Sequence, residues 1–427
     1  MKVLSYSNDI MASSKENRIF SFLAVFMVFG NVYSFPLIHE LGMGEVVLLL
    51  FTPYFIMKAR KTLTLSKGIS GFVLYMVYGL LITLIMSANF QVGAGSIFIR
   101  LARDFFYYFI VLFLGTKFFD KEQFFKWLIR FCVLLSVFVV IQSVIYLGTG
   151  YFIPGFPMNA QLNDGGYIGS ELYSKYLSYA RIAGYLRPNG FLCEPSHCAQ
   201  CFFVALIVLL FGTSHQDRRI MLIAGLISIG SIATMSTSAI VYVLAAWILW
   251  LIKEGKHNAI RVIAIVLVAI IVIVFAYNHG NLSNMISVTN RLTNIFSGNT
   301  VTASSELRVQ KGLTVFLTFP LLYKIVGIGF GTYMSAFQSG FFVSNTAMIE
   351  SEYMNSFSYI LVSSGIIGSV IMVTTLFVLF RRSSILGKMM IIALVIMSLG
   401  SSIYSSPICV WLLLVIINAG QERNSNI

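Results

Sequence analysis

Long apolar segments, separated by short polar ones, dominate the sequence. They reach or approach the roughly 20 residues that a helix needs to cross a bilayer, and lipid offers the backbone no partner outside the helix. The pattern therefore predicts an all-α, polytopic membrane protein that forms a single integral membrane domain over residues 1–427. We expect twelve spans, near residues 19–37, 43–57, 68–87, 97–115, 128–147, 197–212, 219–234, 237–252, 259–277, 356–380, 387–402 and 405–420.

Composition and charge support this interpretation. Hydrophobic residues make up 58% of the chain and charged residues 11%, and the mean hydropathy is +0.85, which excludes a water-soluble domain of ordinary composition. Twenty of the 29 lysines and arginines lie on the side of the N-terminus, so the positive-inside rule places both termini in the cytoplasm. The net charge of +13 is thus mostly a topology signal, and we expect no nucleic-acid partner.

Two long external loops are predicted, at 148–196 and 278–355. Loops of more than about 15 residues in a compact protein are usually either functional or disordered. The first contains ELYSKYLSYARIAGYL, whose apolar spacing predicts an amphipathic helix on the membrane surface. The second contains TVFLTFPLLYKIVGIGFGTY, which predicts a half-buried helix that ends at Pro320 or at the glycines. We therefore expect both loops to be folded lids over the helix bundle.

The predicted span 97–115 carries unusual charges near its start. Arg100, Arg103 and Asp104 lie in its first two turns, and Arg100 and Asp104 are four residues apart, so they are able to pair on one face. Ionisable groups inside a span usually face a cavity or a partner. An interfacial pair whose side chains reach the membrane surface is the alternative.

The stretch LRPNGFLCEPSHCAQC at 186–201 allows a metal site, a disulfide-linked loop or the mouth of an active site. Cys193, His197, Cys198 and Cys201 all crowd the start of one helix, whereas a structural zinc site normally joins two separated ligand pairs, so no metal site is predicted. A Cys193–Cys198 disulfide stays an alternative in an oxidising compartment. The cysteines are not expected to carry the function.

The remaining polar groups of this stretch are better placed for chemistry. Pro195 suits the first turn of a helix, and the carboxylate of Glu194 before it is favoured by the helix dipole. Arg187 precedes Glu194 by seven residues. We expect the two side chains to meet at the outer edge of the membrane.

Several motifs resemble the bacterial O-antigen polymerase (Wzy-type) family, which is related to the O-antigen ligases. They are RPNGFLCEPSHCA, MSTSAIVYVLAA, and ELRVQKG followed by GIGFGTY and SEYMNSFSYILVSSGIIG. The resemblance implies a fold similar to the C-type membrane glycosyltransferases, and polymerisation of undecaprenyl-diphosphate-linked repeat units for O-antigen or exopolysaccharide at the periplasmic face of the inner membrane. The implied partners are the lipid-linked glycan, membrane lipid, a chain-length regulator and a flippase.

This chemistry requires cations for the diphosphate leaving group, and arginine binds phosphate oxygens bidentately. Arg187 and Arg308 are the main candidates for diphosphate binding, and Arg291 and Arg103 are weaker ones. Ion pairs between loops are the structural alternative for each arginine. No DxD cluster appears in the outer loops, so we expect metal-independent transfer without a cofactor.

A general base would activate the attacking sugar hydroxyl. Glu352 is the preferred candidate, because it follows GIGFG near the place where the related ligases carry a histidine. Glu194 is the alternative base, or it orients Arg187. GIGFG itself is not a nucleotide-binding loop, because it follows no strand–helix unit.

Two other functions stay open. An O-antigen ligase, which moves finished glycan onto a lipid core, would use similar groups. A lipid-linked sugar flippase would carry charges at mid-membrane and have short outer loops. The nearly uncharged mid-span positions and the long outer loops favour the enzyme.

Overall fold

The computed structural model describes residues 14–35, 38–59, 67–91, 94–163, 167–183, 186–212, 218–254, 312–342 and 354–421. Helices account for 79% of these residues. Every predicted span coincides with a helix except 259–277, which lies outside the described residues. The mostly helical fold is therefore confirmed, whereas twelve membrane crossings stay a prediction.

The elements, in chain order, have the following bounds: α1 (Lys15–Gly30), β1 (Ser34–Phe35), β2 (Ile38–Gly42), α2 (Met43–Ala59), α3 (Lys67–Asn89), α4 (Ala94–Phe105), the π-helix η1 (Phe106–Val111), α5 (Leu112–Phe118), α6 (Lys121–Thr149), α7 (Gly169–Ala183), α8 (Pro195–Phe211), α9 (Arg218–Ala233), α10 (Thr237–Glu254), α14 (Leu321–Val326), α15 (Tyr333–Gln338), α16 (Ser356–Arg382), α17 (Ile385–Gly400) and α18 (Pro407–Gln421).

Three helices, α3, α6 and α16, are long and apolar enough to cross a membrane, and α8, α10, α17 and α18 are shorter apolar helices. Local sequence sets the bounds of α6. The Asp120 side chain accepts a hydrogen bond from the Gln123 backbone N–H at 3.0 Å at its start, and Gly150 ends it in the left-handed conformation. These apolar helices indicate that the protein associates with a membrane.

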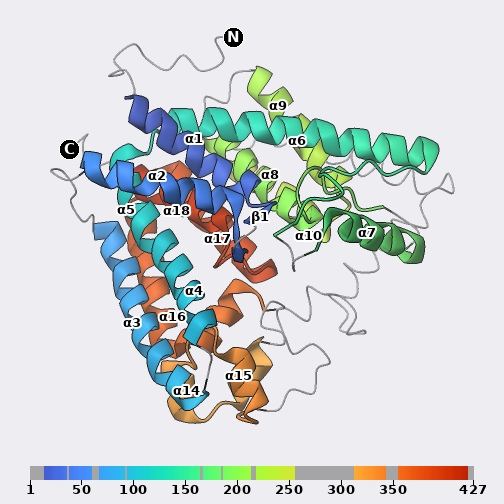
Figure 1. The fold of residues 1–427 in the computed structure, drawn as a ribbon. Coiled ribbons are helices and arrows are strands. Elements are labelled where there is room, and N and C mark those ends of the chain that lie inside the picture. Colours follow the sequence, from blue (N-terminus) through green and yellow to red (C-terminus); the bar gives the residue numbers. More distant parts are fainter. Residues whose placement is uncertain are drawn as a thin grey trace.

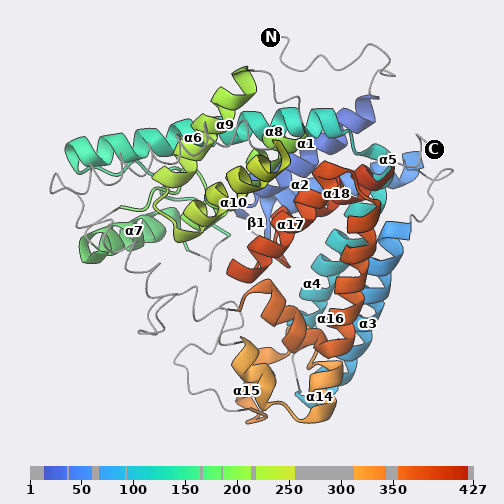
Figure 2. The same cartoon turned by 180° about the vertical axis from the view of Figure 1, so that it is seen from behind.

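The helices form two connected parts (Figures 1 and 2). In one, α3 packs along α16, and α14 packs against α16. In the other, α8 packs against α9, α10 and α17 and is buried along almost its whole length. Helix α18 packs on α17 and on α5, and its residues 408–417 are buried. The core therefore runs through α8 and α18, which the pocket described below adjoins.

A small hairpin replaces the end of the first predicted span. The span was expected to reach residue 37, but α1 ends at Gly30, and β1 and β2 pair antiparallel. Tyr33 also forms a bridge with Leu162, in the first external loop. The expectation of an all-α fold is therefore wrong in this detail, because the polar sequence around Asn31 favours a turn over a continued helix.

The described parts of the two external loops are folded. The expected helix of the first loop is α7, whereas its position on the membrane surface stays a prediction. In the second loop, residues 312–318 are helical and the helix breaks before Pro320, as expected. Three glycines then take positive φ angles: Gly327, Gly329 and Gly331. The Gly329 N–H donates to the Ser363 carbonyl at 2.8 Å, next to a kink in α16 at Gly365.

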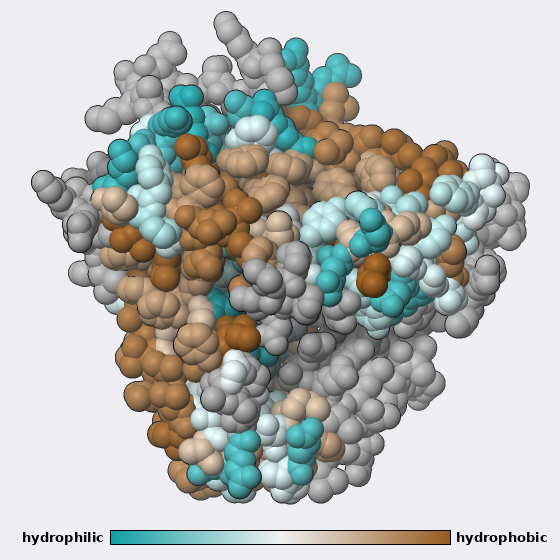
Figure 3. Space-filling model, in the orientation of Figure 1, coloured by the Kyte–Doolittle hydropathy of each residue, from teal (hydrophilic) through white to brown (hydrophobic). Residues whose placement is uncertain are grey.

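Apolar side chains cover much of the outer surface. Figure 3 shows them as a brown column over the part of the molecule that contains α3. On α3 itself, Leu81, Leu84 and Ile85 are each more than half exposed. Exposed leucine and isoleucine on a long apolar helix are typical of a surface that faces lipid.

Candidate functional site

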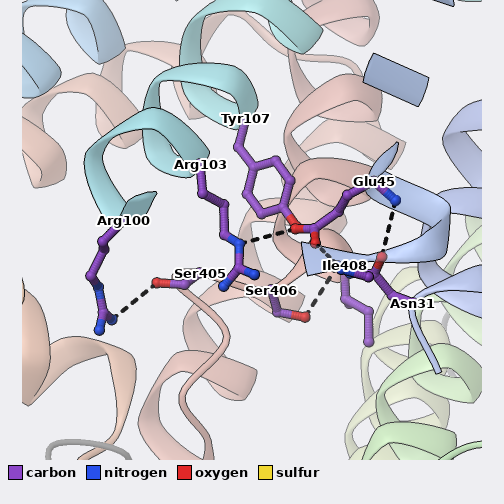
Figure 4. Close-up of polar contacts among 9 residues, drawn as sticks. Asn31, Glu45, Arg100, Arg103, Tyr107, Ser405, Ser406 and Ile408 are labelled. Carbon is purple, nitrogen blue, oxygen red and sulfur yellow. Dashed lines mark hydrogen bonds and ion pairs between the residues drawn. The ribbon is translucent and has the colours of Figure 1, made fainter. Parts of the chain in front are cut away.

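A pocket of about 200 Å³ lies between α1, the start of α2, the junction of α4 and η1, the start of α8 and the segment before α18. Polar side chains of separate elements face one another there, and Figure 4 shows part of the group. They include Asn31, Glu45, Arg103, Tyr107, His197 and Ser405. A polar pocket inside an apolar helical protein is the natural candidate for a functional site.

Glu45 is the most constrained group of the pocket. It lies in the first turn of α2, where the helix dipole favours a negative charge, and it is only 3% exposed. One carboxylate oxygen accepts the Gly42 backbone N–H at 2.7 Å, and the other accepts the Tyr107 hydroxyl. The Glu45 N–H donates to the Asn31 side chain at 3.0 Å. These bonds fix the position of the carboxylate.

Arg103 forms an ion pair with this fixed carboxylate. Its Nε lies 3.2 Å from a Glu45 oxygen, but the N–H does not point along that line, so the contact is electrostatic rather than a hydrogen bond. In Figure 4 the two terminal nitrogens of Arg103 lie on the side away from Glu45, toward the segment that carries Ser405 and Ser406. Glu45 thus holds a guanidinium group in the pocket wall.

Arg100 leaves α4 one turn before Arg103 and extends toward the same segment (Figure 4). Its guanidinium donates to the Ser405 hydroxyl at 3.4 Å and lies over the Tyr359 ring, 5.0 Å from the ring centre. The expected ion pair between Arg100 and Asp104 is not seen in the described part of the chain. On the same helix, Arg103 instead pairs with Glu45 of α2.

The segment 186–194 is a tightly held turn. The Gln142 side chain of α6 accepts the Gly190 N–H at 2.8 Å and donates to the Gly190 carbonyl at 3.2 Å. Gly190 has a φ of 60°, and a Cβ atom there would lie 2.3 Å from the Leu135 side chain. The Cys198 thiol donates to the Asn189 carbonyl at 2.8 Å. Only glycine fits position 190 without displacement of its neighbours.

Arg187 lies in this turn but not in the pocket wall. Its side chain is half-buried, and its Nε has no hydrogen-bond partner in the described part of the chain. The structure forms no ion pair between Arg187 and Glu194, although both residues are described. The ion pair that would follow from the expected meeting of these two side chains is therefore not observed.

Glu194 is the residue that precedes α8, and Pro195 occupies the first turn, as predicted. The Glu194 carboxylate accepts the Ser196 hydroxyl at 2.7 Å. Its neighbour Cys193 lines the pocket, as does His197 one turn further on. Glu194 is thus adjacent to the pocket wall without being part of it.

The cysteines form no disulfide with one another, and all five are buried. The Cys193–Cys198 alternative is therefore excluded in this structure. Within the described residues, no group of three or more histidine, cysteine or acidic side chains is arranged to hold a metal ion.

Three predicted site residues lie outside the described part of the chain: Arg291, Arg308 and Glu352. Their roles as diphosphate ligands and as the base stay predictions. Of the three predicted site residues that the structure describes, Arg103 lines the pocket, and Arg187 and Glu194 do not.

Sequence reasoning missed Glu45 and Tyr107. Glu45 is the one acid in the apolar run MGEVVLLLF, and an acid at the start of a span is itself a signal of a buried partner. Tyr107 follows Arg103 by four residues on the same helical face, and it carries no signal of its own among the many tyrosines of the chain.

No protein-family model matches the chain, and no curated protein matches it significantly.

Proposed function

We propose that this protein is a membrane glycosyltransferase that polymerises undecaprenyl-diphosphate-linked repeat units for O-antigen or exopolysaccharide. The observation that carries the proposal is a guanidinium group, that of Arg103, held by a buried carboxylate in a polar pocket of an apolar helical protein. The resemblance of the sequence motifs to the Wzy-type family supplies the glycan and the lipid carrier. The inner membrane and the periplasmic face of the reaction belong to the same proposal.

The reaction breaks the bond between the sugar and the diphosphate of the donor, so negative charge develops on the leaving group. An arginine fork that is already oriented stabilises this charge without reorganisation at the moment of reaction. Glu45 is the positioning residue for Arg103, because its oxygens already accept two hydrogen bonds and face a cation. Both oxygens of Glu45 are thus already engaged, and we do not propose it as the base. The arginines supply the positive charge, so we propose that the transfer needs no metal ion.

The general base is therefore a different carboxylate. Glu194 is next to the pocket wall, and its oxygen accepts one hydrogen bond from Ser196. Glu352, in the second loop, is the other candidate. Arg187, Arg291 and Arg308 are proposed to bind the remainder of the diphosphate and the glycan.

An assay with the purified protein tests the reaction. With synthetic undecaprenyl-diphosphate repeat units in detergent and a metal chelator present, we expect products that contain two or more repeats. Arg103→Ala should lower the rate by about a hundredfold, the usual cost of one stabilising donor. Arg382→Ala, at the exposed end of α16, is the matched control and should retain the wild-type rate. A wild-type rate in Arg103→Ala would contradict the site assignment.

The two other functions give different results in cells. If the protein were a ligase, cells without it would keep the repeat-unit ladder on the lipid carrier but would carry no ladder on the lipid core. A flippase deletion would remove lipid-linked repeats from the outer leaflet. The proposed polymerase should leave single repeats in place, with no ladder. A chain-length regulator and a flippase are its proposed partners.

A further inference from the structure

The carboxylate of Asp104 lies outside the pocket wall and makes no hydrogen bond to any residue that the structure describes. Its side chain is 1% exposed, and neither carboxylate oxygen has a partner in the described part of the chain. Burying an ionised carboxylate without hydrogen bonds is costly, so such a group needs a counter-charge or a proton. The proposed reaction does not use Asp104, and its burial therefore calls for another role.

The charges around Asp104 are closely balanced. On its own helix it has Arg103 beside it and Arg100 one turn earlier, and both interact with it electrostatically. Arg103 is already paired with Glu45 of α2. Two cations and two anions therefore share this region.

The other described groups that are seen to interact electrostatically with Asp104 are phenols and one thiol, which are uncharged near neutral pH. They come from other parts of the fold: Tyr75 from α3, Tyr107 and Tyr108 from η1, Tyr359 from α16, Tyr404 from the segment before α18, and Cys409 from α18. The hydroxyls of Tyr75 and Tyr404 are buried and interact with each other. Phenols thus make up much of the described surroundings of Asp104.

We propose that Asp104 is a proton-binding site coupled to the pocket, and that it takes up one proton from solvent when an anionic diphosphate binds at Arg103. This inference rests on the proposed function, since it requires a diphosphate ligand. No covalent bond of the ligand changes: the proton ends on a carboxylate oxygen of Asp104, and the diphosphate keeps its own charge.

The reason is electrostatic. A diphosphate brings at least two negative charges to Arg103, next to Asp104 in the sequence. Like charges at short range in a medium less polar than water disfavour the ionised form of a carboxyl group. Neutralisation of Asp104 removes one of the negative charges that then face Arg100 and Arg103. Binding and protonation therefore favour each other, and this linkage is reciprocal.

The test measures binding of farnesyl diphosphate to the purified full-length protein from about pH 5.5 to about pH 8, where a perturbed carboxyl group titrates. The dissociation constant should rise with pH for both proteins. For the wild type we expect it to rise by up to about tenfold more per pH unit than for Asp104→Asn. The ligand's own titration is common to both proteins and cancels in the ratio. Glu122→Gln, in the exposed first turn of α6, is the control and should keep the wild-type slope.

A second measurement does not depend on the variant. Addition of farnesyl diphosphate to the wild type should produce the infrared C=O stretch of a protonated carboxyl group, and Glu122→Gln should show the same band. If the wild type and Asp104→Asn bind the ligand with the same pH dependence, or if no such band forms on binding, the proton site is wrong and diphosphate binding stands. If neither the wild type nor Asp104→Asn binds the ligand at any pH, the proposed function itself is overturned.

Discussion

The two charged regions near the pocket differ in how their partners are joined. Arg103 and Glu45 come from different helices and lie 3.2 Å apart. Arg187 and Glu194 come from one short segment and form no ion pair. The first pair is fixed by packing of α2 against the α4–η1–α5 helix, whereas both members of the second belong to one turn and the start of the helix after it. In this fold, two charges that are close in the sequence do not necessarily pair. Charges on different helices that pack together are more informative.

The largest expected effect is on the first pair. Glu45→Ala would leave the guanidinium of Arg103 in the protein interior without its counter-charge, which costs about 3–5 kcal/mol of stability. Glu194→Ala removes a carboxylate that accepts one side-chain hydrogen bond and should cost roughly 1 kcal/mol. Thermal unfolding of both variants in detergent measures the contrast. Equal losses would show that the two regions are equivalent.

A smaller effect is expected at the hydroxyl groups that support each region. Tyr107→Phe removes a hydrogen bond to a charged carboxylate and should cost about 1.5–3 kcal/mol. Tyr176→Phe, the matched variant beside the second region, removes a bond to the Cys193 carbonyl and should cost about 0.5–1.5 kcal/mol. Thermal unfolding in detergent should show the larger loss of stability for Tyr107→Phe. The reverse order would contradict the picture of Glu45 as an ionised group.

The turn that separates Arg187 from Glu194 gives the next test. Gly190→Ala would force a Cβ into the left-handed region and against Leu135, and should cost roughly 2 kcal/mol. Gly148→Ala, in α6, meets no atom within 4 Å and should be neutral or slightly stabilising. A neutral Gly190→Ala would show that the turn is more adaptable than its geometry indicates.

The sequence predicted the helices well because apolar length is a local property. It also placed Pro195 correctly, since helix starts have local signals. The end of α1 at Gly30 and the hairpin after it were missed because the apolar residues that follow Asn31 outweighed the turn signal of Gly30 and Asn31 in the prediction. The pocket was missed for a different reason. Glu45 and Arg103 are far apart in the chain, and only the packing of their helices brings them together.

The smallest expected effect is the coupling within each pair, and it is the most direct test of the comparison. In a double-mutant cycle of Arg187→Ala and Glu194→Ala, the two losses of stability should add to within about 0.5 kcal/mol, as they do for side chains that share no contact. The cycle of Arg103→Ala and Glu45→Ala should depart from additivity by about 1–3 kcal/mol, because removal of both charges avoids the unpaired one. Unfolding midpoints of the six variants supply both cycles. Strong coupling in the first cycle would mean that Arg187 and Glu194 approach each other in the membrane, and the turn at Gly190 would then have to open for them to meet.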